Sequence, residues 1–252
     1  MKVIAHRGAA AEAPENTLEA VARAIELGAD LVEVDVRSTS DGIPVLIHDA
    51  DLVRTHSVAK LVGDLELSEL EKITAEHGTA VPTLSMLFAR YGGKVDFILE
   101  IKDALATESV VRQIVSDGYI ENVLVACASL RVLRNVKFEI PEIKTGFVLG
   151  SSADEGFESS KSRHNGYGFS VSERVLPVID VMMPYWRLVR HHFVAGCRRY
   201  ALPVYAWLAL FDEDPGPRYD IFSQMAEVGI DGLATIRPEA LRAHLAAPSA
   251  AH

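Results

Sequence analysis

Short apolar runs recur along the chain, and most of them are separated by stretches with helical periodicity. Several runs, such as VLVAC at residues 123–127, are apolar throughout, which is typical of parallel strands that helices cover on the outside. The alternation of strands and helices predicts an α/β fold with a parallel sheet. The predicted strands span residues 2–6, 31–36, 43–48, 96–101, 122–127, 143–149, 179–183, 203–208 and 231–235.

Four helices are marked by their apolar spacing and their end signals. The first has Asn16 or Thr17 as its N-cap and ends at Gly28, a residue type that commonly closes helices. The other three are predicted at residues 67–73, with Ser68 as the cap, at 107–117 and at 190–200.

Nine strands are one more than an eight-stranded barrel holds. The run at 43–48 follows the second strand after only a short turn, STSDG, and no crossover helix fits there. Asp41-Gly42 is a hairpin turn signal, so this run folds back and brings His48 roughly opposite Asp35. The remaining strands predict a (β/α)8 TIM barrel with a small β-hairpin extension after strand 2.

The length and composition fit one large domain. The chain has 252 residues, of which 49% are hydrophobic, enough for a substantial core. We expect a single barrel domain at residues 1–245 and a flexible C-terminal tail at 246–252. Residues 150–175 are polar and rich in Gly and Ser, which predicts a long loop.

The net charge and the lack of targeting signals limit the kinds of partner and the location that we expect. The net charge of −10 argues against a nucleic-acid partner, which needs a basic face. It leaves an anionic substrate open, because a bound cation inverts the local field. No signal peptide and no transmembrane run are evident, so we expect a cytoplasmic protein without stable membrane insertion. The two cysteines suggest no disulfide framework, and Cys127 lies in an apolar run typical of a buried thiol.

Ionisable residues stand at the ends of several predicted strands, and a barrel delivers such residues to its rim. His6 and His48 each end an apolar run. Glu33 and Asp35 are two apart in one strand, so their side chains share a face. Two carboxylates on an inner face repel each other unless a cation pairs with them, and that cation is either an Arg or Lys side chain or a metal ion.

A second pair, Glu100 and Lys102, repeats this spacing on a later strand. It is either a buried ion pair, or one metal ligand and one phosphate-binding ammonium. Together with Arg7, the set contains two imidazoles, three carboxylates and two fixed cations, which are the groups needed for metal-assisted phosphodiester cleavage. Three hard oxygen ligands favour Mg²⁺ or Ca²⁺, whereas a zinc site would more often recruit the histidines.

The motifs that contain these residues are similar to those of a known protein family. They are AHRG at residues 5–8, PENTL at 14–18, GADLVEVDV at 28–36, DGIPVLIHD at 41–49, VPTL at 81–84 and LEIK at 99–102. In these motifs the chain resembles the glycerophosphodiester phosphodiesterase family and, more distantly, the catalytic barrel of phosphoinositide phospholipases C. Looser agreement at residues 203–207 and 229–233 extends the resemblance over nearly the whole chain.

The resemblance implies a catalytic pair and a metal site. His6 and His48 would be the general acid and base, in an order that stays open. Glu33, Asp35 and Glu100 would hold one divalent cation, Mg²⁺ or Ca²⁺. The reaction would release sn-glycerol 3-phosphate and an alcohol from a small glycerophosphodiester, by attack of water or through a cyclic phosphate.

The resemblance also implies residues that contact or support the substrate. Arg7 and Lys102 would contact the phosphate, while Glu15 and Asn16 would support the metal and catalytic groups. Trp207 would line the glycerol or leaving-group side, or it is simply an aromatic residue of the barrel core.

Three departures from the family pattern lie outside the catalytic set. Near the last strand the family usually carries an aspartate where this chain has Ile236. Cys127-Ala128 stands in place of Ser-Phe, and Ser85-Met86 in place of an acidic residue. The resemblance therefore says less about which headgroup alcohol is preferred than about the reaction. The sequence also leaves the preferred metal and the oligomeric state open.

Two other functions compete with this one. A lysophospholipase D-like enzyme would need an apolar entrance near the rim, for which the candidates are Met182, Met183, Tyr185 and Trp186. A degenerate barrel without catalysis would bind no divalent metal. Five other histidines lie in polar loops or on predicted helix surfaces, and we expect no catalytic role for them: His56, His77, His164, His191 and His192.

Overall fold

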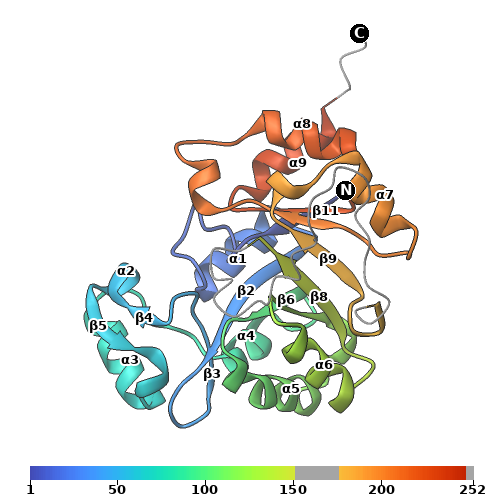
Figure 1. Cartoon of the computed structure of the whole chain (residues 1–252). Coiled ribbons are helices and arrows are strands. Elements are labelled where there is room, and N and C mark those ends of the chain that lie inside the picture. The colour runs from blue at the N-terminus through green and yellow to red at the C-terminus, as the bar shows by residue number, and fades with distance from the viewer. Residues whose placement is uncertain (151–175, 248–252) are drawn as a thin grey trace.

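A computed structural model describes residues 1–150 and 176–247 of the chain, and within them eight parallel strands form a barrel (Figure 1). Their order is β10–β11–β1–β2–β6–β7–β8–β9. Two parallel bridges, Met182 to Val204 and Tyr185 to Trp207, complete the ring between β9 and β10. The strands are β1 (Lys2–Ala5), β2 (Leu31–Ser38), β6 (Asp96–Ile101), β7 (Val123–Cys127), β8 (Lys144–Leu149), β9 (Val181–Pro184), β10 (Tyr205–Trp207) and β11 (Gly232–Thr235). The predicted TIM barrel is confirmed.

Helices surround the barrel and follow its strands (Figure 1). They are α1 (Leu18–Glu26), α4 (Leu84–Tyr91), α5 (Thr107–Ser116), α6 (Leu130–Glu139), α7 (His191–Arg198), α8 (Tyr219–Val228) and α9 (Pro238–Ala246). Thr17 caps α1, because its hydroxyl accepts a hydrogen bond from the Ala20 N–H at 3.1 Å. Of the predicted loop and tail, residues 151–175 and 248–252 lie outside the described residues.

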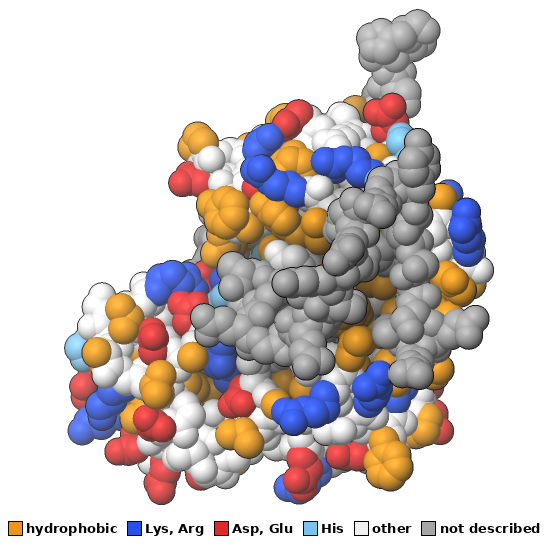
Figure 2. All heavy atoms as spheres, in the orientation of Figure 1, with side chains coloured by type: hydrophobic (Ala, Val, Ile, Leu, Met, Phe, Trp, Pro, Cys, Tyr) orange, Lys and Arg blue, Asp and Glu red, His pale blue; other side chains and the backbone are white. Residues whose placement is uncertain are grey.

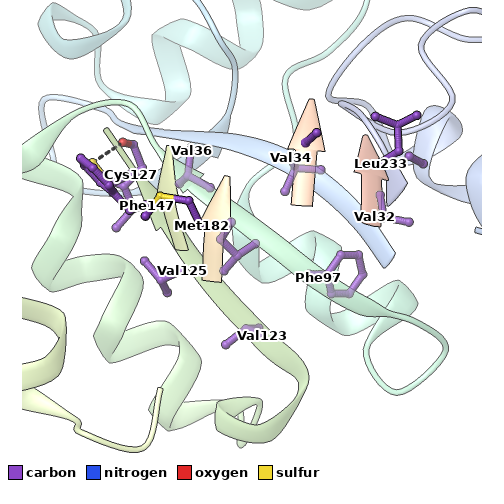
Figure 3. Packing of buried hydrophobic residues seen from close by; sticks show 14 of the residues in the cluster. Val32, Val34, Val36, Phe97, Val123, Val125, Cys127, Phe147, Met182 and Leu233 are labelled. Atoms are coloured by element: carbon purple, nitrogen blue, oxygen red, sulfur yellow. Dashed lines mark hydrogen bonds between the residues drawn. The ribbon is translucent and has the colours of Figure 1, made fainter. Parts of the chain in front are cut away.

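Alternation along each strand separates two cores. The outward-facing side chains pack against the helices, as Figure 3 shows for Val32, Val34, Val125 and Met182 among others. The inward-facing side chains form a second, smaller cluster inside the barrel: Ile4, Leu31, Ile98, Leu124, Ala126, Val148, Val181, Met183 and Ala234. Cys127 belongs to the outer set and is a buried free thiol, as predicted. The inner face is therefore apolar at the base of the barrel.

The hairpin after the second barrel strand is present, with a register that differs from the prediction by one residue. β3 (Pro44–Leu46) runs antiparallel to β2 and pairs Val36 with Leu46. The Ile47 N–H donates to the Asp35 carbonyl at 3.0 Å, so Ile47 rather than His48 lies opposite Asp35. The reason is a three-residue loop, 40–42, with Gly42 at φ 81°, in place of a two-residue turn.

The hairpin opens into a larger insertion, residues 39–82, which projects from the barrel (Figure 1). It contains β4 (Asp51–Leu52), α2 (Val53–His56), β5 (Val58–Leu61) and α3 (Leu67–Glu76). The insertion has a buried core of its own, formed by Val45, Ile47, Leu52, Val62, Leu65, Leu70 and Val81. α3 begins at Leu67, as predicted, and extends three residues beyond its predicted end. Its cap is Glu66, which forms a capping box with Glu69, rather than Ser68.

Among the described helices, none combines the length and apolar character that a membrane crossing needs.

Candidate functional site

The inner face of the barrel changes from apolar to ionisable toward the carboxyl ends of its strands. In β2, Leu31 is followed on the same face by Glu33 and Asp35. In β6, Ile98 is followed in the same way by Glu100 and then by Lys102 just beyond the strand. Because parallel strands end at one rim, this alternation gathers the charged groups at the top of the barrel.

Three carboxylates meet there. Oxygens of Glu33, Asp35 and Glu100 lie within 4.8 Å of one another, and Asp35 and Glu100 are neighbours in the strand register. Among the described residues, Oε1 of Glu33 and Oδ1 of Asp35 are buried and accept no hydrogen bond. Buried, closely spaced oxygens of this kind match the ligand set of Mg²⁺ or Ca²⁺. The residues present therefore fit a divalent cation.

The pKa shifts of Glu33 and Asp35 reflect the free-energy cost of holding buried carboxylates close together. Burial raises the pKa of Glu33 well above its usual value, and the neighbouring charges of Asp35 and Glu100 raise it further. Burial would also raise the pKa of Asp35, but Lys102 and Arg7 hold it below its usual value. A cation at the cluster would favour the ionised form of both groups.

Two cations stand beside the carboxylates. The Lys102 ammonium lies 2.5 Å from Glu100 Oε1 and 3.2 Å from Asp35 Oδ1. Arg7 Nε lies 3.2 Å from Asp35 Oδ2. Each carries positive charge at the rim, where an anionic group of a substrate would be attracted.

The loop after β1 is bent sharply to place Arg7. Arg7 has φ 56°, and its backbone N–H donates to Glu33 Oε2 at 2.7 Å. Gly8 has φ 79°, and a Cβ on it would lie 2.7 Å from Ala20. Only glycine fits such a position, so the HRG sequence is a backbone requirement as well as a chemical one.

Asn16 serves the carboxylates instead of capping the helix. Its Nδ2 donates to Asp35 Oδ2 at 2.8 Å, and its Oδ1 accepts from the Asp35 N–H at 2.9 Å. Glu15 lies next to it, and its Oε1 accepts from Arg7 Nη1 at 2.9 Å. Both residues predicted as supporting groups therefore contact the rim charges.

The two histidines differ in environment. His6 is buried, with Nε2 3.9 Å from Glu33 Oε2. Burial, reinforced by Arg7, lowers the pKa of His6 to about 3. The His48 side chain is 29% exposed, and its Nδ1–H donates to Asp49 Oδ1 at 2.7 Å. One imidazole is thus held neutral, and the other is paired with a carboxylate.

Aromatic residues lie near His6. The Trp207 ring lies 6.5 Å from His6 and 4.8 Å from Tyr185 between centroids. Asp212 is buried and accepts hydrogen bonds from the Tyr185 hydroxyl at 2.9 Å and from Trp186 Nε1 at 3.0 Å. Trp207 Nε1 is buried and has no hydrogen-bond partner.

Met182 and Met183 do not form an apolar entrance. They are 2% and 3% exposed and belong to the two cores. His56 was expected in a polar loop or on a helix surface. Instead it is buried, and its Nε2 hydrogen-bonds to the Thr79 carbonyl at 2.8 Å. His77, His191 and His192 are exposed, and His164 lies outside the described ranges.

Four further polar residues lie near the rim, and none of them was predicted as a site residue: Asp49, Arg54, Asp212 and Glu213. Asp49 directly follows His48, which is a signal that could have been used. Glu213 is fully buried, hydrogen-bonded by the Thr235 hydroxyl and, at 2.8 Å, by the Ile236 N–H. A carboxylate therefore does reach Ile236, but it comes from a residue 23 positions earlier, which no local motif reveals.

Two cavities open at the rim, and Glu15 lines both. One, of about 260 Å³, lies against the insertion and is also lined by His48 and Arg54. The other, of about 340 Å³, is bounded by Phe211, Arg237 and others. The rim thus offers space on both sides of Glu15.

Comparison with known proteins gives consistent matches. The model of the Glycerophosphoryl diester phosphodiesterase family matches residues 6–240. A glycerophosphodiester phosphodiesterase of Caldanaerobacter subterraneus subsp. tengcongensis is 30% identical over 253 residues, covering 95% of each chain.

Solved structures of similar fold agree. A phosphodiesterase of Oleispira antarctica, in complex with the product sn-glycerol-3-phosphate, has a TM-score of 0.78 at 22% identity and covers 98% of this chain and 97% of that one. A glycerophosphodiester phosphodiesterase of Thermotoga maritima has a TM-score of 0.77 at 24% identity and covers 96% and 98%. At these identities the likeness establishes the fold.

Proposed function

The chain belongs to the glycerophosphoryl diester phosphodiesterase family and is an enzyme of that class, and from this premise we propose a metal-dependent mechanism that uses two histidines. The substrate is a small glycerophosphodiester, and the products are sn-glycerol 3-phosphate and an alcohol. The product named for the Oleispira antarctica relative supports this substrate class.

The carboxylate cluster is the observation that carries the proposal. Glu33, Asp35 and Glu100 crowd together at one rim, and two of their buried oxygens accept no hydrogen bond from the described residues. Arg7 and Lys102 offset only part of the negative charge, and a buried carboxylate without full compensation costs several kcal/mol of desolvation. We assign the three residues as ligands of one divalent cation, Mg²⁺ or Ca²⁺. When bound, that cation neutralises negative charge on the phosphodiester.

Arg7 and Lys102 complete the binding of the phosphate. Both ammonium and guanidinium groups lie within 3.2 Å of Asp35, so a phosphate at the cluster would meet two fixed positive charges. Charge that develops on the phosphate oxygens in the transition state is stabilised by such preorganised groups. The Trp207 ring, 6.5 Å from His6 between centroids, gives the glycerol or the alcohol an apolar surface.

The histidines take different roles. Burial keeps His6 neutral near pH 7, so it has an unprotonated ring nitrogen, and we assign His6 as the base that accepts the proton of the nucleophile. His48 is more exposed and hydrogen-bonds Asp49, and we assign it as the group that donates a proton to the leaving alkoxide. The nucleophile is either water or the glycerol 2-hydroxyl.

The test is release of sn-glycerol 3-phosphate from a panel of glycerophosphodiesters, with EDTA and with Mg²⁺ or Ca²⁺ restored. We expect release that EDTA abolishes and one of the two ions recovers. A lysolipid serves as the comparison substrate, and water-soluble diesters should be preferred over it. Release that persists undiminished in EDTA would contradict the metal assignment, and no release from any diester would contradict the substrate class.

A further inference from the structure

A chain of charged contacts leads from His48 across to the barrel. Asp49 accepts the Nδ1–H of His48 through Oδ1 at 2.7 Å. Its other oxygen, Oδ2, accepts from Arg54 Nε at 2.6 Å. The two terminal nitrogens of Arg54 donate to both oxygens of Glu15, at 2.9 and 2.6 Å. Arg54 therefore binds two carboxylates at once.

The contacts of Arg54 join two parts of the fold. Arg54 and Asp49 belong to the insertion, whereas Glu15 lies in the loop after β1 and also binds Arg7. Basic and acidic side chains gather where the insertion adjoins the barrel (Figure 2). Glu15 and Arg54 are 39 positions apart in sequence, so this contact exists only in the folded chain.

The geometry also selects one form of His48. A carboxylate is an acceptor only, so the proton of the neutral imidazole must lie on Nδ1 when Asp49 is in place. Nε2 is then the nitrogen that faces away from Asp49. Asp49 is partly exposed, at 24% of its side chain, and without Arg54 its second oxygen would lose its hydrogen-bond donor.

We propose that Arg54 is a positioning residue for His48, which orients Asp49 and thereby fixes the Nδ1–H form and the direction of the imidazole. The inference rests on the proposed function of His48 as an acid–base group. An isolated exposed ion pair contributes little. Arg54 differs because its planar fork is bidentate on one carboxylate and also binds a second, which gives geometric specificity.

The first experiment compares Arg54 with a matched arginine. Arg23, on α1, also binds two carboxylates, Glu12 and Glu26, and its side chain is 39% exposed against 47% for Arg54. Arg54→Gln should lower kcat by about 10- to 100-fold with little change in KM, the usual range for residues that orient a reacting side chain. Arg54→Lys should have a kcat between those of the unaltered chain and Arg54→Gln, because lysine keeps the charge but cannot form the fork. Arg23→Gln should leave kcat unchanged.

A double variant tests the route through Asp49. If Arg54 acts by orienting Asp49, then Arg54→Gln should lower kcat no further in an Asp49→Asn background. Fully additive losses would overturn the proposal, as would equal losses in Arg54→Gln and Arg23→Gln.

A second readout does not depend on turnover. Nitrogen-15 NMR of the imidazoles reports which nitrogen of His48 carries the proton. We expect the Nδ1–H form in the unaltered chain and in Arg23→Gln, and loss of its dominance in Arg54→Gln. An unchanged proton position in Arg54→Gln would overturn the proposal. If the unaltered chain hydrolyses no glycerophosphodiester, the proposed function fails, and the NMR comparison alone still decides the role of Arg54.

Discussion

At the scale of single residues, the different roles proposed for His6 and His48 predict that the losses of kcat in their alanine variants depend differently on the leaving group. His6→Ala or His48→Ala should each lower kcat by about 10²–10⁴-fold on a natural diester. With a p-nitrophenyl leaving group, which needs no protonation, His48→Ala should lose much less, whereas His6→Ala should lose as much as before. Steady-state rates on both substrates make the comparison.

The reverse pattern would exchange the two roles, and losses below tenfold in both variants would remove the histidines from catalysis. His77→Ala is a suitable control, because that histidine is exposed in the insertion.

Glu213 makes stability depend on pH. Burial raises the pKa of Glu213 to about 7 from 4.5, so the folded protein holds a proton that the unfolded chain releases between those values. The contribution is therefore fully present below pH 4.5 and is lost as the pH rises to about 7. The shift corresponds to roughly 3 kcal/mol over that range.

Glu213→Gln keeps an acceptor for the Ile236 N–H and cannot ionise. Relative to the unaltered chain, its free energy of unfolding should rise by up to about 3 kcal/mol between pH 5 and pH 8. Urea unfolding of both chains at several pH values measures this difference, in which all other titrating groups cancel. Parallel pH profiles would show that Glu213 does not titrate in this range.

At the scale of elements, the sequence predicted what local periodicity encodes. All eight barrel strands lie within two or three residues of their predicted bounds, because continuous apolar runs mark parallel strands. The spacing of Glu33 with Asp35, and of Glu100 with Lys102, also predicted correctly that each pair shares a face. The insertion was largely missed, since β4 has two residues and α2 has four, which is too short for a periodic signal.

The residues that hold the rim together were missed for a different reason. Arg54 meets Glu15, and Glu213 meets Ile236, only through tertiary contacts between distant segments. The register error at His48 came from turn geometry, because Asp-Gly fits both a two-residue and a three-residue loop. No strand pattern distinguishes the two.

That turn gives a prediction about the hairpin. Gly42 has φ 81°, and a Cβ there would meet no atom within 4 Å, so Gly42→Ala adds only backbone strain. We expect a loss of about 1–2 kcal/mol in the free energy of unfolding, with kcat nearly retained. Gly63→Ala is the matched control in the same insertion, because its φ is not in the left-handed region and its nearest atom lies at 3.9 Å. Equal losses in both variants would show that the strain at Gly42 is not the cause.

At the scale of the whole molecule, a chain of net charge −10 holds three of its carboxylates together inside the barrel rim. Arg7 and Lys102 offset part of that charge, yet two carboxylate oxygens accept no hydrogen bond from the part of the chain that the structure describes. The folded state alone forms this cluster, since the strands that supply it are separated in the unfolded chain. A cation that binds the cluster therefore binds the folded state and stabilises the whole protein.

This linkage can be measured without any substrate. At a free concentration about 100-fold above its dissociation constant, Mg²⁺ or Ca²⁺ should add about 2.7 kcal/mol to the free energy of unfolding. For a chain of this size, that corresponds to a rise of roughly 5–10 °C in Tm, followed by calorimetry after EDTA treatment. Glu100→Gln removes one proposed ligand and should abolish most of the rise, whereas Glu108→Gln should retain it, because the Glu108 side chain is 75% exposed on α5 and pairs with the exposed Arg112. An equal rise in both variants would mean that the ion binds elsewhere, and the assignment of Glu33, Asp35 and Glu100 as its ligands would be wrong.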